Sequence, residues 1–277
     1  MNKTIIRIIS GLLCAFIFAA VLPNMPAFAA ESDVTEEKML LEAIGVLDAK
    51  AEENSIVTRA ELIKSVVKLK KVDSKITASV PAFTDLSESH WAYGEIVAAY
   101  QLGYIKADKY GKIYPDSPAS GSFAFKVLVD ALCYKAIAAS YGGNDSAYFK
   151  AAGVIGLTDK ISVSLSAPIE RDDYVRLLYN ALVAPLSEVF VKDGSLGFYS
   201  AEGRTLLNSV YNIYRTTGVV TANKYITLGV NPYEGDKDFI IIDNAKYYTQ
   251  SIDTNELLGC NVKLYYEIDD DDVKTVV

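Results

Sequence analysis

Three segments of the chain carry apolar residues at spacings of three and four positions. Such spacing places the side chains along one face of an α-helix, where they can be buried together. We therefore expect three amphipathic helices, with these apolar stripes: Leu62, Ile63, Val66, Val67 and Leu69; Phe125, Leu128, Val129 and Leu132; Tyr174, Leu177, Leu178 and Leu182.

Each stripe follows a residue pattern that is typical of a helix start. Thr58, Ser120 and Glu170 stand where a side chain would accept hydrogen bonds from the first free N–H groups of the helix. Pro118 and Pro168 stand just before two of these starts, where proline is tolerated because the helix has not yet begun. The pattern predicts three helices that begin in the same way.

A glycine between apolar residues precedes each helix start and predicts the end of an earlier helix. The three glycines are Gly45, Gly103 and Gly153, and each is expected in the left-handed conformation that a Cβ would disfavour. The chain is therefore interpreted as three copies of a helix–loop–helix unit, the first with a shorter loop. One such unit cannot bury its apolar face alone, so we expect the three to share one core.

The residues after about 189 follow a different pattern. Gly194 and Gly197 predict a loop, and residues 201–210 a short helix or the approach to a strand. Segments rich in β-forming residues then alternate with turn signals, which predicts a small antiparallel barrel or sandwich. The expected strands are 210–220, 225–230, 238–242, 246–250 and 262–268.

The predicted fold is thus multi-domain α+β. A mostly helical three-copy bundle over 30–188, with copies at about 33–72, 83–140 and 145–186, precedes a β-rich domain over 189–277. The chain stops at Val277 inside a stretch that reads as a strand. Two interpretations stay open: the β-rich domain is incomplete, or its last edge pairs with something else.

The first 29 residues have the order of a secretory signal peptide. Lys3 and Arg7 precede an apolar stretch that is too short to span a bilayer, and Ala27 and Ala29 suit signal-peptidase cleavage after Ala29. An uncleaved anchor and a lipoprotein signal at Cys14 are the alternatives. All three interpretations predict export, and cleavage would leave no membrane span.

Charge and composition exclude several classes of function. The formal net charge is -8, which disfavours nucleic acid because its phosphates require a basic face. An anionic polymer would meet the same repulsion unless cationic side chains are clustered locally. Cys133 and Cys260 are far apart and the chain has one histidine, so the sequence indicates no disulfide framework, metal site or cofactor. The acidic run 269–272 lacks the spaced ligands and glycine of a calcium loop, and a hairpin turn is expected there.

The sequence assembles no catalytic site. His90 is the single histidine, and no serine stands in a Gly-x-Ser-x-Gly motif. Paired acids for glycoside hydrolysis remain open, because their spacing is three-dimensional. We therefore predict a non-enzymatic protein.

The middle copy carries the most specific motifs. It contains Phe83-Thr84-Asp85, Ser89-His90-Trp91-Ala92, Leu102-Gly103-Tyr104-Ile105 and Gly111-Lys112-Ile113-Tyr114-Pro115. The first copy contains Thr58-Arg59-Ala60-Glu61, and the third keeps Pro168, Ile169, Arg171 and Asp173. Over roughly residues 33–186 the chain resembles the S-layer homology family.

The resemblance implies a pseudo-three-fold helical bundle that binds a secondary cell-wall polysaccharide between its repeats. The family's signature arginine, which helps to hold the anionic glycan, corresponds to Arg59 and Arg171, with acidic positions at Glu61 and Asp173. A planar guanidinium suits a carboxylate such as a pyruvyl group. The middle copy departs from the pattern with Gly121 and Phe123, so one of three sites is expected to have lost its charged chemistry.

Several residues also have a purely structural interpretation. Arg59 and Arg171 are alternatively ion-pair partners of the nearby acids Glu61 and Asp173, and Trp91 is a core anchor or a platform for a sugar. For His90 we expect a capping or solvent-facing position. For Asp85 we expect a turn that fixes the entry to the following helix.

The leading functional hypothesis is non-covalent anchoring of a secreted surface protein to the bacterial cell wall. The expected binding residues are Arg59, Arg171, Glu61, Asp173 and Trp91, and the expected partner is an anionic, pyruvylated polysaccharide associated with peptidoglycan. Surface-layer neighbours are further partners. The alternatives are a wall-remodelling hydrolase, or its fragment, targeted by the repeats, and a purely structural scaffold in a surface layer.

Overall fold

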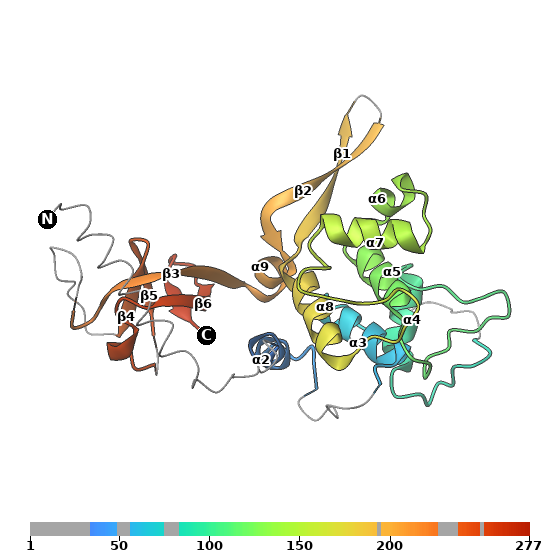
Figure 1. The fold of residues 1–277 in the computed structure, drawn as a ribbon, viewed down its shortest axis with the longest axis horizontal. Coiled ribbons are helices and arrows are strands. Elements are labelled where there is room, and N and C mark those ends of the chain that lie inside the picture. Colours follow the sequence, from blue (N-terminus) through green and yellow to red (C-terminus); the bar gives the residue numbers. More distant parts are fainter. Residues whose placement is uncertain (1–33, 49–55, 75–82, 193–194, 227–237, 250–251) are drawn as a thin grey trace, which may run out of the picture.

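A computed structural model describes residues 34–48, 56–74, 83–192, 195–226, 238–249 and 252–277. The predicted signal peptide lies outside this range. The fold is mixed α+β, with a helical part and a five-stranded closed barrel (Figure 1). The helices of the first part are α2 (Thr35–Ala43), α3 (Arg59–Leu69), α4 (Tyr93–Gln101), α5 (Gly121–Ala131), α6 (Lys135–Ser140), α7 (Asp145–Val154) and α8 (Arg171–Val183).

Helices α3, α5 and α8 are the three predicted amphipathic helices. The side-chain oxygens of Thr58 and Ser120 accept the N–H groups of Glu61 and Phe123, which confirms two of the predicted caps. Glu170 occupies the cap position of α8, but its side chain makes no capping hydrogen bond. All the residues of the three predicted apolar stripes are buried.

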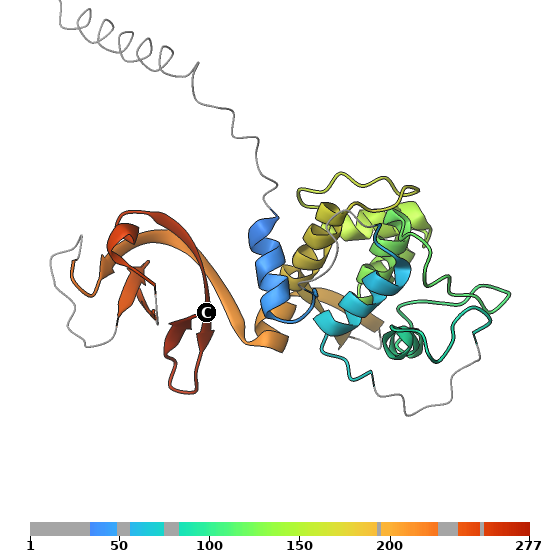
Figure 2. The ribbon, with the colours of Figure 1, turned by 90° about the horizontal axis from the view of Figure 1, so that it is seen from below.

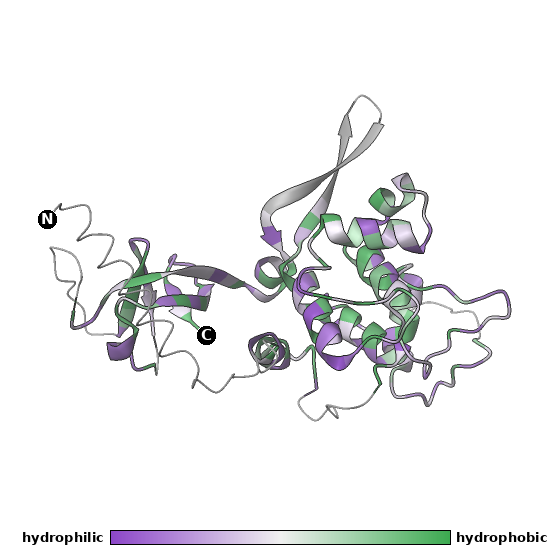
Figure 3. Cartoon of the chain, viewed as in Figure 1, coloured by the Kyte–Doolittle hydropathy of each residue, from purple (hydrophilic) through white to green (hydrophobic). Residues whose placement is uncertain are grey.

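The six longer helices pack in three pairs that cross the boundaries of the predicted copies. Helix α4 packs on α3, α7 packs on α5, and α2 packs on α8. One apolar cluster contains buried residues from all six of these helices. The helices are apolar on some faces and hydrophilic on others (Figure 3), as a shared core between them requires.

Short extended segments join the starts of the three main helices. Thr58 forms an antiparallel bridge with Pro118, and Ser120 forms the next bridge with Pro168. The Arg59 amide donates to the Ser117 carbonyl at 2.9 Å, much as the Gly121 amide donates to Ala167 at 3.1 Å. The chain before each of α5 and α8 therefore lies against the first turn of the preceding main helix.

The predicted glycine turns are correct for two copies and wrong for the third. Gly45 and Gly103 follow α2 and α4 with φ of 75° and 76°. Gly153 instead lies inside α7, and Gly156, with a φ of 79°, takes the left-handed position after it. Two glycines three residues apart both fit the pattern, and only the helix length distinguishes them.

The hairpin of β1 (Pro185–Lys192) and β2 (Ser195–Thr205) projects from the helical part (Figure 1). A loop was expected around Gly194 and Gly197. Gly194 lies outside the described residues, and Gly197 pairs with Phe190 within the hairpin. The short helix expected within 201–210 exists as α9 (Leu206–Tyr211), whose start is a capping box between Thr205 and Asn208.

The strands β3 (Ile213–Asn223), β4 (Phe239–Ile242), β5 (Ala245–Tyr248), β6 (Asn261–Ile268) and β7 (Lys274–Val276) close into a barrel in the order β3-β4-β5-β7-β6, and a short 3-10 helix, η2 (Asn255–Leu257), precedes β6. All neighbours are antiparallel except β5 and β7. The barrel alternative of the prediction is therefore correct. Tyr225 and Ile226 are not in a strand, and residues 227–230 of that expected strand lie outside the described range. The acidic run forms the predicted turn, where Asp269 accepts the N–H groups of Asp271 and Val273.

Side chains from both parts meet where the barrel begins. Helix α2 lies between the barrel and the other helices (Figure 2). Leu206, Leu207 and Ile213 belong to the apolar cluster of the helical part. The Tyr211 hydroxyl donates to the Lys68 carbonyl at 2.9 Å, so the end of α9, just before the barrel, is hydrogen-bonded to α3.

Candidate functional site

The residues of the predicted arginine motif occupy equivalent positions at the starts of α3, α5 and α8. The first helical residues are Arg59, Gly121 and Arg171, and two positions later stand Glu61, Phe123 and Asp173. Arg59 and Arg171, each the first residue of its helix, lie near the third residue of another main helix. Gly121 lies against the loop that precedes α8. We call these places the Arg59 corner (with Phe123), the Gly121 corner (with the loop 162–164) and the Arg171 corner (with Glu61).

An ion pair fills the Arg171 corner. The Arg171 guanidinium donates to both carboxylate oxygens of Glu61, with the longer contact, from Nη2 to Oε2, at 3.4 Å. Only 15% of the arginine side chain and 24% of the glutamate side chain are exposed. The guanidinium also lies 5.5 Å from the ring of the fully buried Tyr174. The charge of Arg171 is therefore neutralised within the protein.

An aromatic ring replaces the carboxylate in the Arg59 corner. The guanidinium carbon lies 4.5 Å from the centre of the Phe123 ring and 5.7 Å from that of Tyr114. Nη1 donates to the Ile113 carbonyl at 3.3 Å, while Nε is buried without a partner among the described residues. Burial lowers the pKa of the Arg59 guanidinium, although the charge of nearby Asp85 favours its cationic form.

Asp85 holds the loop that faces Arg59. Its carboxylate accepts the N–H groups of Ile113 at 2.9 Å and Tyr114 at 2.8 Å. Tyr114 has a φ of 57°, and its hydroxyl donates to Asp108 at 2.7 Å. Asp85 was expected to fix the entry to the next helix, but it instead holds this distant loop and so fixes the carbonyl that contacts Arg59.

A backbone loop closes the Gly121 corner. A Cβ on Gly121 would lie 2.5 Å from the Ser164 carbonyl oxygen and 2.5 Å from Val163 Cγ1. Burial raises the pKa of the Asp173 carboxyl, which a hydrogen bond from the Ser162 backbone partly offsets. The loss of charged chemistry predicted at this corner therefore coincides with a loss of space for any side chain.

Trp91 is displayed on the surface beside the Arg59 corner. Trp91 is 55% exposed, which argues against the core-anchor interpretation. The His90 ring stacks on it with centroids 5.5 Å apart, and Lys64 Nζ lies 5.1 Å from the indole ring. His90 accepts the Ala92 N–H through Nδ1, which fixes the turn before α4; the cap residue of α4 is Ala92, and no side chain caps this helix, so the capping role expected for His90 is not found.

The same loop connects Trp91 with Arg59. His90 Nε2 lies 3.2 Å from the carboxylate of Asp116, two residues after Tyr114. Lys64 stands on α3, as Arg59 does, and shares Asp48 with Lys68 at 3.1 and 3.0 Å. These two lysines lower the pKa of Asp48. The surface around Trp91 therefore carries two lysines and two carboxylates, those of Asp48 and Asp116.

The structure separates the predicted binding residues into different environments. Glu61 and Arg171 come together across copies, whereas the ion pairs considered in the sequence lay within a copy. Arg59 and Trp91 share one surface loop, and Asp173 lies in the Gly121 corner. Sequence reasoning missed Lys64 and Tyr114 as neighbours, because their contacts with Trp91 and Arg59 join residues 27 and 55 positions apart.

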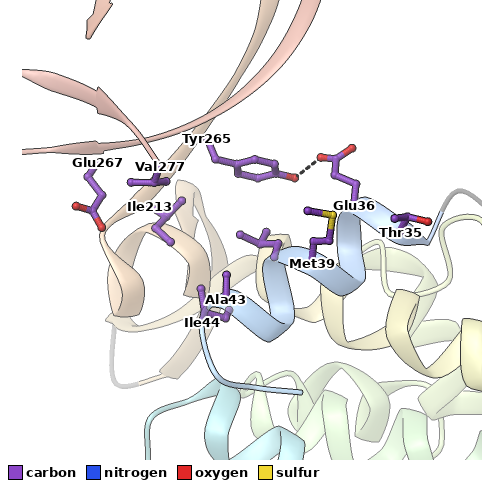
Figure 4. A pocket seen from close by; sticks show the side chains of 10 residues that line it. Thr35, Glu36, Met39, Ala43, Ile44, Ile213, Tyr265, Glu267 and Val277 are labelled. Atoms are coloured by element: carbon purple, nitrogen blue, oxygen red, sulfur yellow. Dashed lines mark hydrogen bonds between the residues drawn. The ribbon is translucent and has the colours of Figure 1, made fainter. Parts of the chain in front are cut away.

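A different hollow of about 800 Å³ lies between α2 and the barrel (Figure 4). Apolar side chains dominate its lining, among them Met39, Ala43 and Ile213. Glu36 at its rim accepts the Tyr265 hydroxyl at 2.8 Å and pairs with Lys263 at 2.6 Å. An apolar lining of this kind does not suit a hydroxyl-rich, anionic glycan.

Within the described ranges, the histidine, cysteine and acidic side chains form no group of three or more that could hold a metal ion. The helices of these ranges are also too short or too polar to cross a membrane.

Comparison with known proteins gives two findings. The sequence model of the S-layer homology domain matches residues 82–122, which include Asp85, Trp91, Tyr114 and Gly121. A protein described as "Cell surface protein" from Thermoanaerobacter kivui is 26% identical over 285 residues. That alignment covers 96% of this chain and 34% of the relative, so this chain spans about a third of the relative's length. The family match covers the first two thirds of the predicted middle copy and neither of the other two copies.

Proposed function

We propose that this chain is an exported cell-surface protein, held non-covalently at the bacterial cell wall by its helical part. In this proposal the helical part consists of three S-layer-homology-like repeats and binds a secondary wall polysaccharide. In this proposal the barrel and the projecting hairpin act as a spacer, or they display further parts of the protein away from the wall. The role is binding rather than catalysis.

The observation that carries the proposal is the combination of Arg59 with aromatic side chains around the loop 113–117. The S-layer homology match spans this loop. The half-buried guanidinium of Arg59 contacts the loop at Ile113, which Asp85 holds in place. At the other end of the loop, Asp116 contacts His90, the neighbour of the exposed Trp91. Guanidinium groups pair with carboxylates, and an indole offers a flat apolar face to a sugar ring. Both features suit a carboxylated glycan.

The packing of the helices supports the three-repeat interpretation. Each of α2, α4 and α7 packs on the main helix of another predicted copy, and the bridges at Thr58 and Ser120 repeat from one copy to the next. This cyclic arrangement is what three equivalent units around one core would produce. The sequence of the first and third copies has diverged further, so that only the middle copy matches the family model.

The test is binding of residues 30–277 to purified wall sacculi, before and after acid removal of the secondary polymer. We expect sedimentation with untreated sacculi and little with stripped ones. Equal binding to both would contradict the polysaccharide as ligand, and binding to neither would contradict anchoring. Release of reducing sugar from wall glycan during the same incubation would favour the hydrolase alternative.

A further inference from the structure

The hairpin of β1 and β2 is a sheet of only two strands. Among the residues that the structure describes, β1 pairs with β2 and with no other strand, so its outer edge carries backbone N–H and C=O groups that no neighbouring strand satisfies. The hairpin projects from the helical part (Figure 1). An isolated two-stranded hairpin is marginally stable in water, and further strands stabilise it.

Both ends of the hairpin are fixed to the helical part. Ala184 is buried just before β1, and the Tyr134 hydroxyl donates to the Pro185 carbonyl at 2.9 Å. Beyond β2, Leu206 and Leu207 of α9 belong to the apolar cluster of the helical part. The hairpin therefore begins and ends on the folded core, and the strands between these ends form the projecting part.

The register of the hairpin places apolar residues together on one of its faces. Residues paired across an antiparallel ladder lie on the same face, and neighbours along a strand lie on opposite faces. Two pairs of the ladder on one face are wholly apolar: Val189 with Phe198, and Val191 with Leu196. Two strands make this face narrow, and a wider sheet buries more apolar surface between neighbouring strands.

The other face of β1 carries two opposite charges. Glu188 and Lys192 lie on it with Phe190 midway between them, since alternate residues of a strand share a face. Within the hairpin Glu188 pairs with Tyr199, and Lys192 pairs with Ser195, so the ladder places no opposite charge across from either of them. The segment 188–192 is thus apolar at its centre, with an acid at one end and a base at the other.

We propose that the outer edge of β1 pairs with the same edge of a second copy of the chain, so that two hairpins form one four-stranded antiparallel sheet. Phe190 lies opposite its own counterpart in this pairing. Val189 then lies opposite Val191 of the second copy, and Glu188 lies opposite Lys192. Because the pairing is two-fold symmetric, it forms two Glu–Lys pairs and closes at a dimer. It needs no wall polymer and is separate from anchoring.

The outer edge of β2 does not have this complementarity. Its segment 195–201 contains no charged residue, and it includes Gly197, a residue type that is unfavourable in strands. Charged residues on an edge strand also disfavour pairing with unrelated edges. Glu188 and Lys192 therefore act against other partners and favour one register with a second copy.

Sedimentation velocity of residues 30–277 over a range of concentrations tests the pairing, and we expect a monomer–dimer equilibrium. Glu188→Lys and Lys192→Glu should each raise the dissociation constant about tenfold or more, because each sets two pairs of like charges opposite one another. The chain with both substitutions regains two opposite pairs and should dimerise within about threefold of the unaltered chain. The single variants change the net charge in opposite directions, so an effect of net charge alone would strengthen one dimer and weaken the other.

Cross-linking tests the register in a chain with Cys133→Ser and Cys260→Ser. Phe190→Cys should give a covalent dimer with a short bismaleimide linker, because residue 190 lies opposite its counterpart in the adjacent strand. Tyr199→Cys is the matched control on the same face of β2. It should stay monomeric, since three strand spacings, about 14 Å, separate the two copies of residue 199.

A chain that stays monomeric at every concentration would overturn the inference. Undiminished dimerisation of the two single-charge variants, or cross-linking through residue 199 rather than 190, would overturn it as well. Thermal unfolding of each variant shows whether the helical part has kept its fold. Neither experiment contains sacculi, so a failed dimer leaves anchoring intact, and failed retention on sacculi leaves the dimer intact.

Discussion

The Arg59 and Arg171 corners begin with the same residue at the same helical position, yet their partners give them different roles. Arg171 is held by Glu61 and joins α8 to α3. Arg59 packs against Phe123, and the loop 113–117 that it contacts also contacts His90, the neighbour of the exposed Trp91. If the proposed function is correct, a motif arginine is available to a ligand only where the protein does not already satisfy it. A repeated motif therefore does not imply a repeated site.

The strongest test of this difference is to remove each charge in turn. Under the proposed function, Arg59→Gln should weaken binding of a methyl hexoside with a 4,6-linked pyruvate ketal (the pyruvate-ketal hexoside) about 30-fold, since a charge-assisted contact with the carboxylate is lost. Arg171→Gln should leave the affinity within about twofold, because that guanidinium is already paired. Calorimetric titration below the unfolding temperature of both variants measures the two effects. A larger loss for Arg171→Gln would reverse the assignment of the corners.

Loss of stability should rank the two corners in the opposite order, as Glu61→Gln and Arg59→Gln test. Glu61→Gln leaves the largely buried Arg171 without its anion, and we expect the free energy of unfolding to fall by about 2 kcal/mol. Arg59→Gln removes only ring contacts and one hydrogen bond, at about 1 kcal/mol. Urea unfolding of both variants provides the comparison. Equal losses would mean that Arg59 has a structural partner of similar strength.

The Gly121 corner should reject even a methyl group. Gly121→Ala would place a Cβ against Ser164 and Val163, so we expect a loss of about 1.5 kcal/mol in the free energy of unfolding. Gly153→Ala is the matched control: Gly153 lies in α7, and a new Cβ there would lie 3.6 Å from Thr158 Oγ1, an ordinary van der Waals contact. The control should be neutral or slightly stabilising by thermal unfolding. A tolerated Gly121→Ala would show that the loop 162–164 does not fill this corner.

The smallest effect concerns the aromatic part of the site. Trp91→Ala should weaken sugar binding by about 1 kcal/mol with little change in unfolding, because the indole is exposed. Tyr110→Ala removes another exposed ring of the same copy, 65% exposed, and should change neither quantity. Titration with the methyl hexoside that lacks the pyruvate ketal measures the contribution of the aromatic ring alone. Equal effects of the two variants would exclude a specific platform at Trp91.

Local patterns in the sequence were enough to predict the main helices. The stripes, the caps at Thr58 and Ser120 and the turn at Asp269–Asp272 depend on residues within a few positions of one another. The choice between Gly153 and Gly156 was ambiguous locally, since both follow apolar helical residues. The strand β2 was missed because Gly197 was interpreted as part of a loop, whereas its pairing with β1 decides the conformation.

The corners were less predictable, because their contacts join distant residues. The sequence identified Arg59, Glu61 and Arg171 through a resemblance, but it placed each arginine beside the acid of its own copy. Residues two positions apart on a helix do not face each other, so the acid of another copy is the available partner. The significance of Phe123 could only follow from knowing which arginine it faces.

Side-chain NMR tests the central claim most directly, because it follows both arginines in the unaltered chain. The Nε–H signals of Arg59 and Arg171, assigned with the Gln variants, are recorded while the pyruvate-ketal hexoside is added. We expect the Arg59 signal to move and saturate with one equivalent bound, and the Arg171 signal to stay in place. A shift of Arg171 with the same saturation, with Arg59 unchanged, would contradict the account.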